Sequence, residues 1–359
     1  MSSDRKLTHL EICREREVRA RRETTHLDDV MLVHDAAPEL SLSEIDLETR
    51  LFGKTLAAPI LISAMTGGHP ATKKINESLA EAAQSLGIGM CVGSQRAAIE
   101  DPRMGDSFRV VRDISREMLV VGNIGAPQLL SYDAVDYAQR AVDMIGADAL
   151  AVHLNPLQEI VQPGGDTKYR GVLEGLERIT RALKVPVVVK ETGCGISSDV
   201  ARSLVAAGAA AIDVAGLGGT SWAAVEHYNA LMSKEEVKAH VAETFWDWGI
   251  PTAMSIWEVA SLKSGATLIA SGGITNGVDV AKSIALGADL AGIARPLLKP
   301  AYSGAPAVRR VLEGVIYELK VASMLTGSRS VSELKSARLY LRGDLLGWIA
   351  QSKAKAGTR

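Results

Sequence analysis

Apolar and polar positions along the chain follow two alternating rhythms. Eight short apolar runs have the length of buried β-strands, and they occupy residues 58–64, 88–92, 118–122, 147–152, 185–190, 209–214, 267–270 and 289–293. Segments between them carry apolar residues at helical spacing, most clearly 72–86, 132–145, 171–183, 198–207 and 278–286. Alternating strands and helices form a parallel sheet with right-handed crossovers. Eight such units predict an α/β fold, a (β/α)8 TIM barrel whose active site lies on the loops after the strands.

The segment before the first strand, residues 1–57, departs from this rhythm. Charges of both signs crowd its beginning, and from about Leu10 their spacing predicts a solvated helix. Three polar residues would precede that helix: Arg5, Lys6 and His9. Short apolar pieces around Ala36 predict strands or a hairpin. We therefore expect an N-terminal arm and a cap over the bottom of the barrel.

Two more segments lie outside the eight units. The interval between the sixth and seventh strands is unusually long and carries two helical patterns. We expect an insertion there over residues 218–248, serving as a lid or an oligomer contact. Residues 58–300 would form the barrel proper, and 301–359 would close it with helices at 305–326 and 331–354. The whole chain is expected to form a single domain.

Polar residues replace apolar ones abruptly where the fourth strand ends, in the motif His-Leu-Asn-Pro-Leu-Gln-Glu. Strand alternation would place His153 and Asn155 on one face, and Gln158 and Glu159 would follow on the loop. An imidazole, two amides and a carboxylate thus meet at the carboxyl end of a buried strand, where parallel α/β folds bind ligands. The alternative is a turn followed by a solvated Gln-Glu pair.

Glycines and small residues follow the last two strands. Gly272 and Gly273 let backbone N–H groups approach a ligand, and the next helix would present its positive N-terminus. Gly292 and Ala294 follow the eighth strand, where TIM barrels commonly hold a phosphate. The two loops predict a phosphate site, and the alternative is a pair of ordinary tight turns.

A single lysine, Lys190, ends the otherwise apolar fifth strand. A buried lysine is costly unless it meets an anion, and the alternative is a lysine that reaches out to solvent. Other strand ends carry Met65, Thr66 and Asn123. Their apolar contact, hydroxyl and amide suit a planar ligand that forms hydrogen bonds.

Composition narrows the function classes. The 359 residues are 47% apolar and include 33 glycines, which suits a large core with many tight turns. Aromatic residues make up only 4%, and 40 basic residues against 42 acidic ones leave a net charge of -2. This balance disfavours nucleic-acid and membrane partners. No apolar run is long enough to span a bilayer, so the chain is expected in the cytoplasm.

The cysteines give no sign of a disulfide framework or a nucleophile. Cys13, Cys91 and Cys194 lie far apart and form no paired motif, which fits a reducing compartment. We expect Cys91 to be a buried thiol within a strand. Cys194 is expected to be an incidental loop residue.

Five segments together resemble the type 2 isopentenyl-diphosphate isomerases, which are barrels that bind flavin mononucleotide (FMN). The segments are residues 5–9 (Arg-Lys-Leu-Thr-His), 63–68 (Ser-Ala-Met-Thr-Gly-Gly), 94–96 (Ser-Gln-Arg), 153–159 and 249–253 (Gly-Ile-Pro-Thr-Ala). The 153–159 motif is the most specific, because other flavin barrels share the glycine loops. One residue departs from the family pattern. Thr275 stands where arginine is common, so contacts to the flavin phosphate there would come from the backbone.

The resemblance implies a reaction and its cofactors. The family interconverts isopentenyl and dimethylallyl diphosphate with FMN and Mg²⁺, with NADPH as the usual reductant and no net redox change. Reduced flavin would be the acid and base, because no protein carboxylate is otherwise free near the double bond. The family also implies a homo-oligomer, a tetramer or an octamer, acting on a small-molecule diphosphate.

The resemblance further implies a role for each matched residue. Gln158, His153 and Asn155 would form the catalytic set. Gln158 would also touch the substrate, and His153 and Asn155 would hold its diphosphate. Glu159 would ligate Mg²⁺, a hard ion that prefers carboxylates. Lys190 would stabilise the anion of the reduced ring. The remaining diphosphate donors would be Arg5, Lys6, His9, Ser94 and Arg96. Flavin contacts would come from Ala64, Met65, Thr66, Ser94, Asn123, Lys190, Thr220, Gly272, Gly273 and Ala294.

Two other functions remain open. An FMN-dependent 2-hydroxy-acid oxidoreductase would share the barrel, the lysine after strand five and the glycine loops. Such enzymes usually need a histidine late in the barrel, and none follows His240. A non-catalytic barrel that senses flavin or a phosphate ligand would leave the 153–159 motif and the basic arm without purpose.

Overall fold

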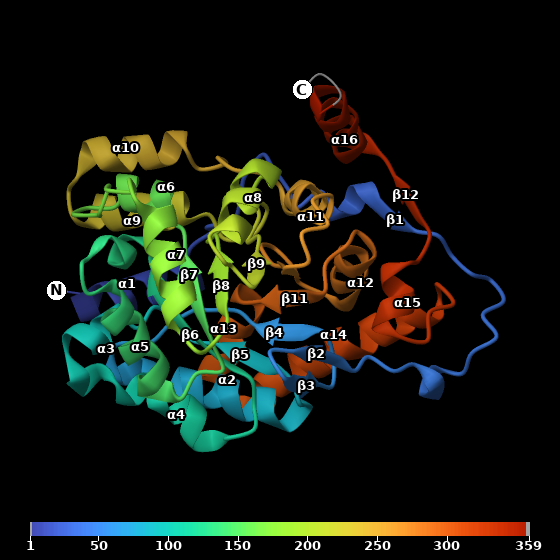
Figure 1. Cartoon of the computed structure of the whole chain (residues 1–359), viewed down its shortest axis with the longest axis horizontal. Coiled ribbons are helices and arrows are strands. Elements are labelled where there is room, and N and C mark those ends of the chain that lie inside the picture. The colour runs from blue at the N-terminus through green and yellow to red at the C-terminus, as the bar shows by residue number, and fades with distance from the viewer. Residues whose placement is uncertain (1, 357–359) are drawn as a thin grey trace.

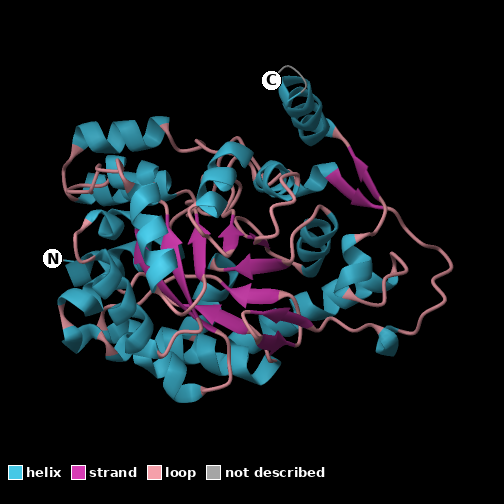
Figure 2. Ribbon diagram, viewed as in Figure 1, coloured by secondary structure: helices cyan, strands magenta, loops and turns pink. Residues whose placement is uncertain are grey.

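Eight parallel strands close into a barrel in the computed structural model, which describes residues 2–356 (Figures 1 and 2). In chain order they are β4 (Ile60–Ile62), β5 (Gly89–Cys91), β6 (Val120–Gly125), β7 (Ala149–His153), β8 (Val187–Lys190), β9 (Ala211–Asp213), β10 (Thr267–Ala270) and β11 (Leu290–Ile293). Each strand pairs with the next, and β11 closes the ring against β4. The predicted TIM barrel is confirmed, and each predicted run overlaps its strand.

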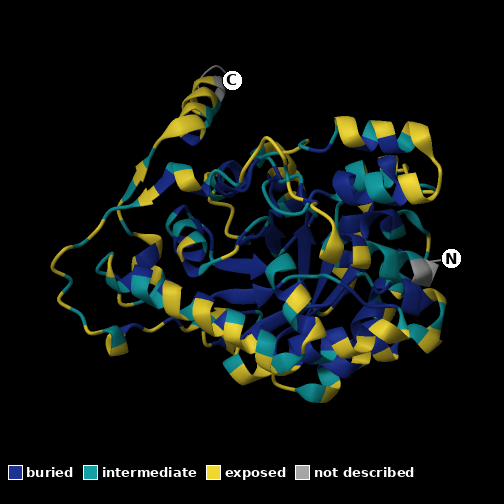
Figure 3. Cartoon of the chain, turned by 180° about the vertical axis from the view of Figure 1, so that it is seen from behind, coloured by how far each residue is buried: buried dark blue, intermediate teal, exposed yellow. Residues whose placement is uncertain are grey.

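Helices cover the outside of the barrel, with buried faces inward and exposed faces outward (Figure 3). The helices on this outer layer are α2 (Lys73–Leu86), α4 (Asp106–Ile114), α5 (Ala134–Ile145), α7 (Val172–Ala182), α8 (Ser198–Ala206), α11 (Thr252–Ala260), α12 (Gly277–Ala285), α13 (Arg295–Tyr302) and α14 (Ala305–Met324). In α2, Ile75, Leu79 and Ala83 recur at helical spacing and are buried, and Gly87 ends the helix with a φ of 64° that favours glycine. All five predicted barrel helices are confirmed, whereas α4 and α13 were not predicted.

A hairpin plugs the bottom of the barrel. It consists of β2 (Thr49–Leu51) and β3 (Lys54–Leu56), and its Leu51 and Leu56 pack among the side chains inside the barrel. The predicted bottom cap therefore exists, but no strand forms around Ala36 within the described residues. The remaining early strand, β1 (Val30–Leu32), pairs with a strand near the other end of the chain.

The C-terminal segment differs from the prediction. Instead of one helix over 331–354, it forms α15 (Val331–Lys335), β12 (Leu339–Leu341) and α16 (Gly343–Ala356). β12 is the antiparallel partner of β1, and both lie at the edge of the molecule beside α16 (Figure 1). The prediction failed because this pairing joins residues about 300 positions apart, which local periodicity cannot reveal.

The N-terminal helix begins earlier than predicted. α1 spans Ser2–Glu15, so Arg5, Lys6 and His9 lie on the helix and not before it. The mixed charges do mark a helix, but one that lacks a wide apolar stripe and is held by tertiary contacts. Ile12 and the following Val18 are buried against the insertion, in a cluster with Val225 and Trp246.

The expected insertion after the sixth strand is confirmed. It leaves the barrel at Leu217 and returns at Pro251, which form a bridge to each other, and it contains α9 (Trp222–Met232) and α10 (Glu236–Thr244). Figure 1 shows both helices on the side of the barrel where α1 and the short helix α6 (Pro156–Val161) lie. Over the described residues, no helix is both long and apolar enough to cross a membrane.

Candidate active site

The polar residues expected at the strand ends do gather at one mouth of the barrel. His153 and Lys190 end β7 and β8 as register partners, and Asn123 lies on the neighbouring β6. α1 and α6, which carry site residues, each pack against α9. Side chains from the beginning, middle and later part of the chain therefore share one site.

His153 is held in one orientation by a chain of buried amides. Its Nδ1 lies 2.8 Å from Asn123 Oδ1, and the Asn123 amide donates to Val92 O at 3.0 Å. Gln95, which is fully buried, accepts from Asn123 N at 2.8 Å and donates to Ala141 O. Because the amide oxygen of Asn123 accepts, Nδ1 of His153 carries the proton. Sequence reasoning treated Gln95 only as a motif position and missed this supporting role.

Burial and nearby cations keep His153 neutral. Burial is the larger cause and the charges of Lys190 and Lys6 the next, and together they lower the pKa of His153 to about 3. The same kind of crowding acts on Lys6, where burial and the guanidinium groups of Arg5 and Arg96 lower the pKa to about 8. The site thus concentrates positive charge, as an anion-binding site requires.

The rest of the 153–159 motif forms a helix and not the expected loop. Pro156 is the first residue of α6, a position that suits proline because the missing N–H would have no helical partner. Asn155 donates to both Gln158 Oε1 and Glu159 Oε1 at 3.1 Å, so one amide aligns the two side chains. Tyr169 donates its hydroxyl to Asn155 Oδ1 at 3.1 Å. The solvated Gln-Glu alternative is excluded.

Glu226 on α9 is the functional residue that sequence reasoning missed. Its side chain is fully buried and accepts from Gln158 Nε2 at 3.0 Å and from Asn229 Nδ2 at 2.8 Å. His9 Nε2 lies 3.1 Å from the same carboxylate. Burial raises the pKa of Glu226, but His9, Gln158 and Asn229 outweigh it, so the pKa is lowered and the group is ionised. One carboxylate from the insertion thus joins α1 to the 153–159 motif.

The basic residues of α1 reach the same mouth. Lys6 Nζ donates to Ser94 O at 2.8 Å, and Arg5 Nη1 lies 3.0 Å from the amide oxygen of Gln162 in the orientation that satisfies both amide atoms. Arg5, Arg96 and Glu159 line one polar cavity of about 520 Å³. The predicted diphosphate donors are therefore brought together, although Ser94 meets Lys6 through its backbone.

The residues expected to contact a planar ligand lie on or directly after β4, β6 and β8. Ala64 and Met65 are half-buried after β4, and Thr66, Asn123 and Lys190 are buried. Lys190 Nζ donates to the carbonyl of Glu191. The alternative of a solvent-exposed lysine is excluded. Thr220 stands at the start of the insertion, where it bridges to Arg19 and is half-buried.

The glycine loops after β9 and β10 are packed backbone against backbone. A side chain on Gly272 would lie 2.2 Å from Gly216 O, and one on Gly219 would lie 2.4 Å from Gly273 N. Across the described residues, the N–H groups of Gly273 and Ala294 donate no hydrogen bond. The loops after β10 and β11 thus each offer one free backbone donor, at Gly273 and at Ala294.

The first turn of α12, predicted to present its positive N-terminus to a phosphate, is capped by nearby side chains. Asn276 caps it by accepting from Asp279 N at 2.8 Å, and Asp279 in turn accepts from Thr275 N and Oγ1 at 3.0 Å. These side chains occupy two of the backbone N–H groups at the start of α12, those of Thr275 and Asp279. The free donors are instead those of the loops themselves, at Gly273 and Ala294.

The cysteines behave as predicted. All three are free thiols, and burial raises the pKa of Cys91 to about 12 and that of Cys194 further still. Neither would supply a thiolate at neutral pH. The chemistry of the mouth must come from other groups.

The chain is similar to a known protein family and to several named relatives. Residues 3–104 and 156–341 match the FMN-dependent dehydrogenase family. The chain is 49% identical over 348 residues to an isopentenyl-diphosphate delta-isomerase of Archaeoglobus fulgidus, covering 97% of this chain and 98% of that protein. A relative of the same name from Methanothermobacter thermautotrophicus is 46% identical, with 98% and 97% covered. One from Halobacterium salinarum is 47% identical, with 98% and 96% covered.

Solved structures agree on the fold. A mandelate oxidase carrying a monooxide FMN adduct superposes with a TM-score of 0.63 at 20% identity and covers 89% of this chain and 90% of that one. A mandelate oxidase with a difluorinated hydroxy acid gives a TM-score of 0.65 at 19% identity, with 94% and 95% covered. These likenesses support the barrel alone. By its sequence relatives, the chain belongs to the FMN-dependent, type 2 isopentenyl-diphosphate delta-isomerase family.

Proposed function

We propose that the protein interconverts isopentenyl diphosphate and dimethylallyl diphosphate, using FMN and Mg²⁺. One observation carries the proposal. The basic residues Arg5, Lys6 and Arg96 and the 153–159 motif lie at the same mouth of the barrel, and Glu226 contacts both α1 and the motif. Arg5, Lys6 and Arg96 concentrate positive charge there, as a diphosphate requires.

The residues of the mouth fit FMN. The free N–H groups of Gly273 and Ala294 suit its phosphate, which agrees with the backbone contacts expected where Thr275 replaces arginine. The half-buried Ala64 and Met65 suit the face of the ring, and the buried Lys190 suits its anionic reduced form. The remaining contacts would come from Thr66, Ser94, Asn123, Thr220 and Gly272. When bound and reduced, the flavin would supply the acid and base chemistry.

Glu159 fits Mg²⁺ in the manner usual for diphosphate enzymes. That ion commonly takes one or two carboxylates and completes its coordination with water and substrate phosphate. Glu159 lines the polar cavity beside Arg5 and Arg96. Within the described residues, no cluster of three or more His, Cys, Asp or Glu side chains could hold a metal alone. A single carboxylate plus substrate oxygens is therefore the arrangement we propose.

Gln158 would orient the reacting end of the substrate. Its amide is fixed at both atoms, because Oε1 accepts from Asn155 and Nε2 donates to Glu226. The tertiary carbocation formed by protonating the double bond would be shielded from water by α1 and α9, which pack against each other. Neutral His153 and Asn155 would hold the diphosphate from the barrel side, while His9, Ser94 and the three basic residues hold it from the α1 side.

The reductant and the assembly also belong to the proposal. We propose NADPH as the usual electron donor for the flavin and a homo-oligomer as the working form, both on the family resemblance. Oxidation of 2-hydroxy acids is the competing activity. No histidine follows His240, which is exposed on α10, so the late-barrel histidine that such oxidoreductases usually need is missing.

The direct test supplies isopentenyl diphosphate with FMN, Mg²⁺ and NADPH or dithionite, without oxygen. Dimethylallyl diphosphate should form, and removing Mg²⁺ with a chelator should stop the reaction. Glu159→Ala should lower Mg²⁺-dependent turnover on the order of 100-fold while FMN stays bound. The matched control is Glu177→Ala, at a half-exposed position on α7 where the carboxylate pairs with Arg181.

Two results would count against the proposal. Failure to isomerise under these conditions, together with turnover of a 2-hydroxy acid, would favour the oxidoreductase. Full activity of Glu159→Ala would remove Glu159 as the metal ligand while leaving the isomerase intact.

A further inference from the structure

Asp213 is the last residue of β9 and lies beside Lys190, the lysine proposed to contact the flavin. It is the register partner of Lys190 on β8, and Lys190 is the register partner of His153 on β7. An imidazole, an ammonium and a carboxylate thus form one row across three adjacent strands. Asp213 lies outside the family-like segments and outside the loops that follow the strands.

The row is buried and its acidic end is fixed. Lys190 is 7% exposed, Asp213 6% and Ser271 4%. Ser271 Oγ donates to Asp213 Oδ1 at 2.5 Å, which anchors the carboxylate on the neighbouring strand end. Among the described residues, Lys190 and Asp213 form no direct ion pair. Lys190 Nζ donates instead to the backbone carbonyl of Glu191. Their charges interact through space.

Asp213 is the carboxylate available to balance Lys190. Burial is the largest influence on the pKa of Asp213 and raises it, and the charge of Lys190 and the Ser271 hydrogen bond offset only part of that rise. The other nearby carboxylate, Glu191, is taken up by its own loop, where it accepts from the N–H groups of Thr192, Gly193 and Cys194. A buried ammonium without a counter-charge either neutralises or moves toward solvent.

We propose that Asp213, anchored by Ser271, is a positioning residue that acts through Lys190 to favour the reduced form of bound FMN. By balancing the buried ammonium, it keeps Lys190 charged and in the row at the barrel mouth. Lys190 in turn stabilises the negative charge of the reduced ring. The inference rests on the proposed FMN site and adds a residue to it.

The test measures the dissociation constants of oxidised and reduced FMN, without substrate. In Asp213→Asn, the preference for reduced over oxidised FMN should fall at least about tenfold, which lowers the midpoint potential by about 30 mV for a two-electron couple. Ser271→Ala keeps the carboxylate but removes its anchor. Ser271→Ala should lower the FMN midpoint potential by less than Asp213→Asn does. It keeps the proposal testable even if Asp213→Asn does not fold.

A double-mutant cycle separates action through Lys190 from direct action on the flavin. If Asp213 acts through Lys190, Asp213→Asn should change nothing further in a Lys190→Met background. Asp148→Asn is the matched control, because Asp148 is a carboxylate at the bottom of the barrel, bound to Arg112. It should leave the potential unchanged.

Three results would overturn the inference. They are an unchanged potential in Asp213→Asn, a raised potential, and an equal shift in the Lys190→Met background. A raised potential would mean that the carboxylate repels the reduced ring directly. Failure of the wild type to bind FMN would instead refute the proposed function, so the two failures are distinguishable.

Discussion

At the scale of single residues, the site is built from buried polar groups that satisfy one another. Asn123 orients His153, and Asn155 aligns Gln158 with Glu159. The sequence named most of these residues, because they stand in one motif or at strand ends. It could not name Glu226, which lies 67 residues after Glu159 on an insertion helix with no motif of its own.

Glu191 provides a pH-dependent prediction at this scale. Burial raises its pKa from 4.5 to about 7, although three backbone N–H groups and Lys190 favour the charged form. Because the folded-state pKa lies above the unfolded value, ionisation weakens the fold progressively between about pH 4.5 and 7. The full penalty, up to about 3 kcal/mol, is present above that window.

The neutral Glu191→Gln should therefore gain stability relative to wild type as pH rises from 4.5 to 7. Melting temperatures of both proteins across pH 4–8 measure this difference. The half-exposed Glu177→Gln should show no such trend. A stability difference between wild type and Glu191→Gln that stays constant from pH 4.5 to 7 would contradict the raised pKa of Glu191.

At the scale of elements, backbone contacts decide where the loops stand. The turn after β10 meets the loop after β9 at van der Waals distance, and Thr25 from the N-terminal segment covers it. The sequence marked the glycines and predicted a phosphate site. It assigned the site partly to the α12 N-terminus, which Asn276 and Asp279 already satisfy.

Gly273→Ala tests the turn. The added methyl would lie 2.4 Å from Thr25 Cγ2 at a residue whose φ is 78°, so the turn must move. We expect FMN binding to weaken at least about tenfold, or roughly 1.4 kcal/mol. Titration with FMN, followed by flavin fluorescence, measures the loss.

Gly314→Ala is the control for that substitution. Gly314 lies within α14, and nothing lies within 4 Å of an added methyl. It should bind FMN normally and gain about 0.5–1 kcal/mol of stability, because alanine favours a helix more than glycine does. Equal FMN affinity of Gly273→Ala and wild type would show that the turn does not set the phosphate contacts.

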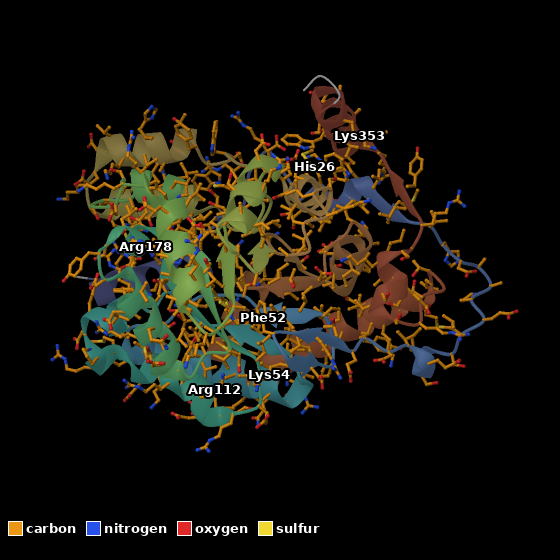
Figure 4. All side chains as sticks on the ribbon, in the orientation of Figure 1. His26, Phe52, Lys54, Arg112, Arg178 and Lys353 are labelled. Atoms are coloured by element: carbon orange, nitrogen blue, oxygen red, sulfur yellow. The ribbon has the colours of Figure 1, made fainter. Side chains whose placement is uncertain are left out.

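At the scale of the whole molecule, stability and chemistry occupy opposite ends of the barrel. Phe52, Lys54 and Arg112 lie near one another at its base (Figure 4). Arg112 donates to the carbonyls of Ile145, Ser115, Arg116, Met118 and Gly146 and to Asp148 Oδ2. One guanidinium thus ties α4, α5 and the starts of β6 and β7 together, far from the mouth.

Arg112→Ala should therefore lower stability without touching the active site. Losing these hydrogen bonds at a half-buried position should cost roughly 3 kcal/mol. Denaturant unfolding measures the cost, and the FMN dissociation constant should stay within about twofold of wild type. The exposed Arg109→Ala on the same helix should be nearly neutral. A matching loss of FMN affinity in Arg112→Ala would contradict the separation.

The sequence by itself determined the barrel and the principal chemistry. Strand and helix periods are local, so they predicted eight units, and the position of a residue after a strand assigned it to the mouth. His153, Lys190 and the glycine loops were found in this way. The motif at 153–159 was found because its polar residues interrupt an apolar strand.

Only the tertiary structure decided which distant groups meet. It brought Lys6 and His9 on α1 to Ser94 and Glu226, paired β1 with β12, and aligned Lys190 with Asp213. Such contacts depend on register, insertion geometry and burial, which leave no fixed spacing in the sequence. The same cause explains why α1 was placed too late: its helix is stabilised by the insertion it packs on, and not by a pattern of its own.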